Sequence, residues 1–173
     1  MHQEQDIRLA SVHDVIGGNP QNIGPTSLVV RADDTPAALL KEGRELDEQA
    51  VERAIGVVPP IIAGAYRLML GLSSHDLSAM RELLGMPERV LCATQRGGLY
   101  LTATFDYGSF VCQFDTGVDT LARFDCNLEV FGKHKYVRVE YDTPYIMNLP
   151  IRLFVSEPNG EHGVTEQQVH PAW

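Results

Sequence analysis

A single histidine interrupts the most apolar stretch of the chain. His75 lies in the run GLSSHDL (residues 71–77), in the middle of a segment that otherwise has the pattern of a buried helix. Polar groups inside a buried helix cost on the order of 1–3 kcal/mol each unless they are paired. Histidine exchanges a proton near neutral pH, which suits general acid–base catalysis. The pattern offers His75 as a catalytic residue and Asp76 as a substrate-binding neighbour. Alternatively, the two form a hydrogen-bonded polar pair in the core.

Three further polar clusters supply candidate substrate-binding residues. His13 stands beside Asp14 on the first predicted strand, where adjacent side chains point to opposite faces, so that only one of them shares a site. Arg123 and Asp125 share a face of a later strand and suit a hydroxylated or anionic ligand. Tyr141 begins an aromatic-rich loop of the kind that edges pockets. The alternatives are a strand-end polar pair, a cross-strand ion pair and a turn with packed tyrosines.

Hydrophobic periodicity places these residues on two long helices and several strands. We expect strands over residues 7–15 and 27–31, an amphipathic surface helix over 36–55 and a helix that is apolar almost all round over 61–84. Six strands follow, and Gly97-Gly98 is a two-residue hairpin signal between the first two of them. The predicted ranges are 89–96, 99–105, 110–116, 124–131, 135–141 and 150–156.

Early helices followed by a run of strands predict an α+β fold. Short connections favour antiparallel neighbours, so we expect an open, largely antiparallel sheet with helices packed on one face. The open face is expected to carry an apolar mixture of Phe110, Phe114, Leu128, Val137 and Val139. An exposed apolar patch of this kind typically marks an interface, and two-fold symmetry is the commonest arrangement. We therefore expect a homodimer through the open sheet face.

Composition limits the class of protein. The chain has 173 residues, of which 44% are hydrophobic and 21% are charged, as in a packed domain. We expect a single domain over residues 1–173. The net charge of -9 repels phosphate backbones, which argues against a nucleic-acid partner. The polar N-terminus and the lack of a run approaching ~20 apolar residues argue against a signal peptide and a membrane span. Three widely spaced cysteines indicate reduced thiols, no metal site and a cytoplasmic location.

Nucleotide-binding motifs are missing from the sequence. No Gly-x-Gly-x-x-Gly follows a strand, and there is no Walker loop or Gly-x-Ser-x-Gly elbow. The segment most similar to such a motif is Gly17-Gly18-Asn19-Pro20, but its proline argues against a phosphate-binding turn. We therefore expect that this chain alone binds no dinucleotide cofactor.

Several segments together resemble a known family. Residues 74–87 (SHDLSAMRELLGMP) resemble the signature helix of the Gfo/Idh/MocA oxidoreductases, the family of glucose–fructose oxidoreductase and inositol dehydrogenase. In that family a histidine-bearing helix ends in Leu-Leu-Gly-x-Pro. Residues 98–107 and 127–132 are similar to the strands that follow. The resemblance covers nearly the whole chain, and it is specific in the helix and the sheet after it.

The resemblance implies the C-terminal α+β domain of such an enzyme, without its Rossmann domain. NAD(P) would then come from a separate Rossmann-domain partner, and the catalytic lysine of the family's Glu-Lys-Pro motif has no counterpart here. The family's helix typically reads Asp-x-Gly-x-His, which places its histidine at His75, its glycine at Ser73 and its aspartate at Gly71. Asp76 cannot simply replace that aspartate, because it is rotated by ~100° around the helix from His75.

Three functions remain open at this point. The first is a substrate-binding and oligomerisation domain of an NAD(P)-dependent oxidoreductase that acts on sugar- or polyol-like molecules. The second is a stand-alone, cofactor-independent isomerase, dehydratase or cyclase with His75 as its acid or base. The third is a non-catalytic dimerisation partner.

Overall fold

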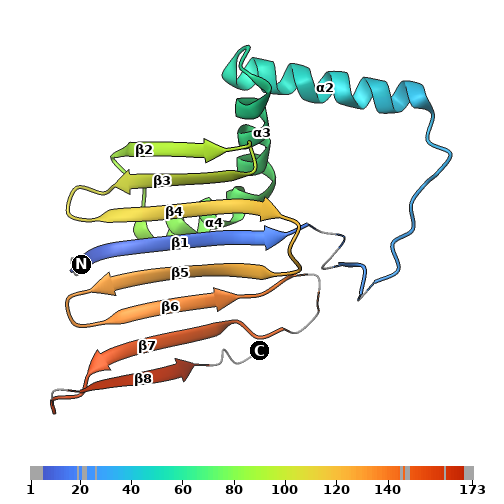
Figure 1. Cartoon of the computed structure of the whole chain (residues 1–173). Coiled ribbons are helices and arrows are strands. Elements are labelled where there is room, and N and C mark those ends of the chain that lie inside the picture. Colours follow the sequence, from blue (N-terminus) through green and yellow to red (C-terminus); the bar gives the residue numbers. More distant parts are fainter. Residues whose placement is uncertain are drawn as a thin grey trace.

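The computed structural model describes residues 6–18, 20, 23–25, 27–144, 146, 149–161 and 163–169. Its helices and strands are labelled as in Figure 1. In chain order they are β1 (Ile7–Gly17), α2 (Ala37–Ile55), α3 (Pro60–Leu68), a π-helical turn (Met69–Ser73), α4 (Ser74–Leu84), β2 (Arg89–Arg96), β3 (Tyr100–Asp106), β4 (Val111–Asp119), β5 (Phe124–Gly132), β6 (Tyr136–Tyr141), β7 (Arg152–Pro158) and β8 (Val164–Val169).

The described strands form one sheet in the order β2-β3-β4-β1-β5-β6-β7-β8 (Figure 1). β1 runs parallel to β4, and every other neighbouring pair is antiparallel. The predicted α+β class with an open, largely antiparallel sheet is confirmed. The sequence did not predict that β1 lies between β4 and β5. A short link joins β4 directly to β5 along the chain, so it has to pass the end of β1. Four residues reach roughly 13 Å, which is enough to cross two strand spacings of about 4.8 Å.

Most predicted elements appear within a few residues of their expected bounds. Gly97 and Gly98 form the predicted hairpin turn, with φ values of 62° and 70° that favour glycine. The expected strand over residues 27–31 is wrong, because these residues belong to no strand. β8 was not predicted at all. Its sequence, VTEQQV, has only two β-branched apolar residues, and its pairing with β7 comes from the sheet.

One continuous helical segment, residues 60–84, lies against one face of the sheet, behind the strands in Figure 1. Met80 of α4 packs there against a core that includes Val12 of β1, Phe114 of β4 and Leu128 of β5. The segment is buried on one side only. Ile61 and Leu83 are 42% and 49% exposed, so the expectation of a helix buried all round is wrong.

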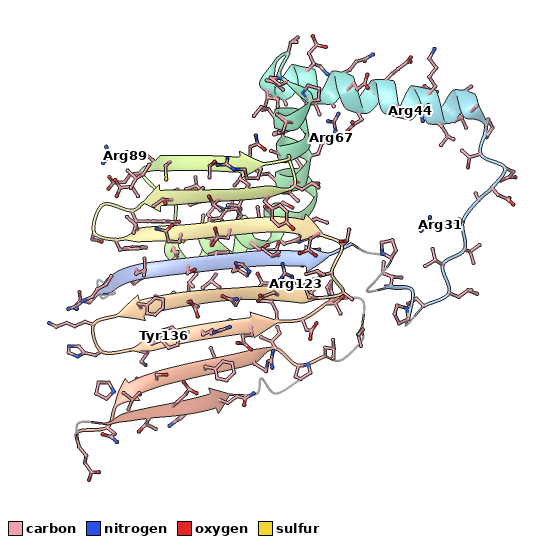
Figure 2. The ribbon with its side chains drawn as sticks, in the orientation of Figure 1. Arg31, Arg44, Arg67, Arg89, Arg123 and Tyr136 are labelled. Atoms are coloured by element: carbon pink, nitrogen blue, oxygen red, sulfur yellow. The ribbon has the colours of Figure 1, made fainter. Side chains whose placement is uncertain are left out.

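α2 extends away from the sheet (Figure 1). Val51 is its one buried residue, and Leu39, Leu40 and Leu46 on its apolar stripe are exposed. Arg67 of α3, labelled in Figure 2, holds the two helices together with a contact of 2.6 Å from its Nη2 to Oδ2 of Asp47.

The face opposite the helices is mostly polar. The register places Phe114 and Leu128 beside Val12 on the helix side, and Val139 faces the same way because it pairs with Leu128. Val137 pairs with Val130 on that side too, while Phe110 precedes β4 and stacks on Tyr107. The expectation that these five residues form the open face is therefore wrong. That face carries mostly charged and hydrogen-bonding side chains, which include His13, Asp115, Glu129, Arg138, Glu140 and Arg152, together with the apolar Leu9, Phe131 and Phe154.

Within the described residues, no single helix is both long and apolar enough to cross a bilayer. α2 and residues 60–84 meet that length and composition only when they are taken together, and they are bent by 91°.

Candidate active site

The π-helical turn before α4 determines on which side of the helix the residues around His75 lie. A π turn inserts one residue into the helical repeat, and such turns are frequent at functional sites. Ser73, which ends the turn, is fully buried, and its hydroxyl donates to Oγ1 of Thr116 on β4 over 2.9 Å. Asp76 is also buried, three residues later on the side that faces the sheet. Leu72 and His75 are likewise three residues apart, and both line cavities.

His75 is exposed and lines two adjoining cavities. The first cavity, of about 540 Å³, lies between α4, the ends of β1, β5 and β6, and the segment after β6. The second cavity, of about 410 Å³, lies against α3 and the π-helical turn and shares Leu72, His75, Phe124 and Pro144 with the first. Volumes in this range suit a small ligand. The polar residues that line the first cavity are Asp14, His75, Asp76, Cys126, Tyr141, Asp142 and Thr143.

Two carboxyl groups meet on the sheet side of the first cavity. Asp14 of β1 is 1% exposed and Asp76 of α4 is 2% exposed. The thiol of Cys126 on β5 donates to Oδ1 of Asp14 over 2.8 Å, and the hydroxyl of Tyr141 on β6 donates to Oδ1 of Asp76. Oδ2 of Asp14 is buried and accepts no hydrogen bond from the described residues. We call Asp14 and Asp76 the carboxyl pair.

Burial and mutual repulsion favour one bound proton on the carboxyl pair. The pKa of Asp76 is raised to about 8, mainly by burial and also by a hydrogen bond to Asp14 and by the charge of Asp14. Two carboxylates in contact do not both ionise readily, because like charges repel strongly in a site with little water. A proton on Asp76 also supplies the donor that Oδ2 of Asp14 otherwise lacks.

Cys126 belongs to the same network as a donor. Burial raises the pKa of its thiol well above the usual range, and the hydrogen bond to Asp14 acts in the same direction. The thiol therefore stays protonated at neutral pH. A protonated, buried thiol holds Asp14 in place and is a poor nucleophile.

The structure brings three of the predicted site residues to one cavity. His75, Asp76 and Tyr141 all line the first cavity, although they come from α4 and β6. The polar partners of Asp76 are Asp14 and Tyr141. The alternative of a buried His75–Asp76 pair does not fit, because His75 is exposed at the cavity while Asp76 is buried behind it.

The other three predicted residues lie away from this cavity. His13 is on the opposite face of the sheet, with Nε2 3.6 Å from Oδ2 of Asp125 and Nδ1 4.0 Å from Oδ2 of Asp115. Arg123 does not pair with Asp125, because its Nη2 lies 2.7 Å from Oδ2 of Asp119 (Figure 2 labels Arg123). Neither Arg123 and Asp125 nor His13 line the cavity of His75, and substrate binding by these three residues stays a prediction.

Sequence reasoning missed Asp14 and Cys126. A signal for Asp14 was present, because Ala10, Val12, Asp14 and Ile16 repeat every second residue and share the core face of β1. Adjacent strand residues do point to opposite faces here, and Asp14 rather than His13 faces the cavity. Cys126 gave no such signal, since a thiol on a strand commonly fills core space.

Comparisons with known proteins bear on the fold. No family model matches the chain, and no curated protein matches its sequence. Among solved structures, UDP-N-acetylglucosamine 3-dehydrogenase GnnA from Acidithiobacillus ferrooxidans aligns with 98% of this chain at a TM-score of 0.52 and 13% identity. The chain spans 41% of the length of that structure. It therefore shares the α+β fold of one part of this dehydrogenase.

Proposed function

We propose that this chain is the substrate-binding part of an oxidoreductase that acts on a sugar- or polyol-like hydroxylated molecule, with His75 as its general acid or base. One observation carries the proposal. An exposed histidine lines two adjoining cavities, in a fold shared with part of a sugar-nucleotide dehydrogenase. The helix over residues 74–87 also resembles the signature helix of the Gfo/Idh/MocA oxidoreductases.

The lining of the first cavity suits a hydroxylated ligand. Leu72, Phe124, Leu149 and Ile151 supply apolar contact, while the carboxyl pair and Tyr141 supply hydrogen-bonding groups on the sheet side. Sugars present both apolar ring faces and hydroxyl groups, so a pocket with both kinds of surface can orient them. In oxidation of an alcohol, His75 takes the proton of the reacting hydroxyl, and it returns this proton in the reverse reaction.

The coenzyme that the family resemblance implies does not fit the glycine pair of this chain. The amide of Gly17 donates to the carbonyl of Arg123 over 2.7 Å, and the amide of Gly18 donates to the carbonyl of Asp119 over 3.1 Å. Both amides are therefore already used and do not cradle a phosphate. In this proposal NAD(P) is held by a separate Rossmann-domain partner, where a nicotinamide would supply the redox half of the reaction.

A reconstitution experiment tests the proposed function. The chain alone is titrated with NAD(P), and turnover of UDP-N-acetylglucosamine, glucose and inositol is then followed after a separately expressed Rossmann domain is added. We expect no saturable nucleotide binding by the chain alone, turnover with the partner, and loss of turnover in His75→Ala. His134→Ala is the matched control, because His134 lies in the exposed β5–β6 hairpin turn. Tight NAD(P) binding by the chain alone would contradict the proposal.

The two alternative functions give different results in the same experiment. A cofactor-independent isomerase, dehydratase or cyclase converts substrate without nucleotide or partner and loses this activity in His75→Ala. The specific observation in its favour is the carboxyl pair, which gives the cavity a second group able to hold a proton. A non-catalytic dimerisation partner shows no turnover under any condition and no effect of His75→Ala beyond stability.

A homodimer through the open sheet face stays a prediction, and the structure changes its expected chemistry. The face carries ion pairs, such as Arg138 Nη2 to Glu140 Oε1 at 2.7 Å and Arg152 Nη2 to Glu140 Oε2 at 2.9 Å. Association through such a surface weakens as salt screens the charges. Sedimentation at low and at high salt tests this, and a monomer at micromolar concentration in both would remove the dimer. A cytoplasmic location is part of the same proposal.

A further inference from the structure

The carboxyl pair is a second group in the first cavity that can hold a proton, separate from His75. Asp14 and Asp76 come from β1 and α4, and both are at least nine-tenths buried while they line the cavity. Oδ2 of Asp14 has no donor among the described residues. A buried carboxylate oxygen without a donor is costly, so this atom requires a donor, and a proton shared with Asp76 supplies one.

Groups from each neighbouring element surround the carboxyl pair. Cys126 faces Asp14 from β5, and Tyr141 faces Asp76 from β6. Asp142 lines the same cavity after β6, and His75 lines it from α4 itself. On β4 the neighbouring polar group is the hydroxyl of Thr116, which accepts a hydrogen bond from the hydroxyl of Ser73. No lysine or arginine lines the first cavity, so no cation among the described residues offsets the charge of the pair there.

Protonation decides what the pair can bind. A carboxylic acid beside a carboxylate both donates and accepts a hydrogen bond, whereas two carboxylates only accept. A hydroxyl group also donates and accepts, so it complements the singly protonated pair. Against the doubly ionised pair, a hydroxyl group can still donate, but its own oxygen finds no donor and faces negative charge.

We propose that Asp14 and Asp76 share one proton and together bind a hydroxyl group of the substrate on the sheet side of the first cavity. This inference rests on the proposed function only in taking the ligand to be a hydroxylated molecule. The pair binds and orients the substrate, while His75 moves the proton of the reacting hydroxyl. Substrate affinity therefore depends on the proton of the pair, independently of the histidine.

The first test follows the carboxyl pair in the intact chain without ligand. Carbon-13 resonances of the aspartate carboxyl groups are titrated in the wild type and in Asp14→Asn, with Asp115→Asn as the matched control on the opposite face of the sheet. We expect one carboxyl proton to persist at pH 7 and to be released near pH 8, and we expect this step to move to lower pH in Asp14→Asn, which removes the like charge. Asp115→Asn should leave it in place. Two carboxylates fully ionised at pH 7 would overturn the proposal.

The second test measures sugar affinity as a function of pH. Binding of glucose and of UDP-N-acetylglucosamine to the chain is measured by calorimetry at pH 7 and pH 9. Because only the protonated fraction binds, we expect about tenfold weaker binding at pH 9. Asp76→Asn, which is neutral and both donates and accepts, should retain binding and lose the pH dependence, and Asp76→Leu should lose binding at both pH values.

These results separate the inference from the proposed function. His75→Ala should bind sugar with unchanged pH dependence even where it abolishes turnover in the reconstituted enzyme. If Asp76→Asn keeps the full loss of affinity at pH 9, or if neither sugar binds at any pH, the hydroxyl-binding role of the pair is overturned. Loss of turnover in His75→Ala would still stand as evidence for the proposed function.

Discussion

The hydroxyl of Tyr141, at the end of β6, donates a hydrogen bond to Oδ1 of Asp76, which lies 65 residues earlier on α4. This contact joins the outer half of the sheet to the helix that carries His75. It also positions Tyr141 beside the carboxyl pair at the cavity. The site therefore depends on a contact between two elements that are remote in the sequence.

Removal of this hydroxyl should destabilise the protein. Tyr141→Phe leaves a buried carboxyl group without its donor, which costs about 1–3 kcal/mol of unfolding free energy. Tyr136→Phe is the control, because Tyr136 of β6 (labelled in Figure 2) donates to Oε1 of Glu129 on the polar open face, where water can replace the lost donor. Denaturant unfolding of both variants checks this. Equal losses would show that the Tyr141 contact has no special weight.

Stability should fall as pH rises from about 4 to 8. The pKa of Asp76 is raised from 3.8 to about 8 in the folded chain, so the folded state holds a proton that the unfolded state releases across this window. The resulting slope is about -1.4 kcal/mol of unfolding free energy per pH unit for this one proton. Asp76→Asn should remove that slope, and Asp115→Asn should keep it. Urea unfolding at several pH values measures both, and an unchanged slope in Asp76→Asn would count against the raised pKa.

One of the three thiols should react in the native protein. Cys92 on β2 is exposed, while Cys112 and Cys126 are buried. Burial raises the pKa of Cys112 to about 12 and that of Cys126 beyond the usual range, so neither forms a thiolate at neutral pH. A chromogenic disulfide reagent should titrate one thiol in the folded chain and three in denaturant. Cys92→Ser should lower both counts by one, and rapid native reaction of two thiols would contradict the burial.

The turn between β2 and β3 should tolerate alanine at one glycine better than at the other. Both glycines have positive φ, so alanine is strained at either position. A Cβ at Gly98 would lie 2.9 Å from the carbonyl oxygen of Ile61 on α3, whereas nothing lies within 4 Å of a Cβ at Gly97. We expect Gly97→Ala to cost about 1 kcal/mol and Gly98→Ala about 2–3 kcal/mol. Thermal unfolding compares the two, and equal losses would argue against close packing of the turn on α3.

An aspartate at position 71 should be accepted without loss of stability. Gly71 lines the second cavity with His75, and no atom lies within 4 Å of a Cβ there. Glycine is also a poor helix former, so Gly71→Asp should change the unfolding free energy by less than about 1 kcal/mol. Because the family resemblance places an aspartate here, we expect faster turnover in the reconstituted enzyme. Gly71→Asn is the control without the charge, and an equal gain from both variants would exclude a role for the carboxylate.

The local sequence pattern predicted most of the helices and strands of this protein, and it predicted that the apolar helix carries the candidate site residues. Two-residue alternation identified β1, glycine pairs and turns marked the hairpins, and the polar residues in residues 71–77 singled out His75 and Asp76. These features depend on near neighbours in the chain, which is why periodicity and turn chemistry predict them. The same reasoning placed Tyr141 at the edge of a pocket, and it lines the first cavity.

Only the tertiary structure decided which of these residues meet. The four-residue link between β4 and β5 is long enough either to join adjacent strands or to cross the end of one strand between them. The sequence therefore did not determine that β1 lies between β4 and β5. That insertion brings Asp14 between Thr116 and Cys126 and beneath Asp76, and it sends His13 to the opposite face. A carboxyl group changes its proton affinity through burial and a neighbouring charge, and both depend on contacts between remote segments. The candidate catalytic histidine was therefore visible in the sequence, whereas the carboxyl pair beside it was set by the order of the strands.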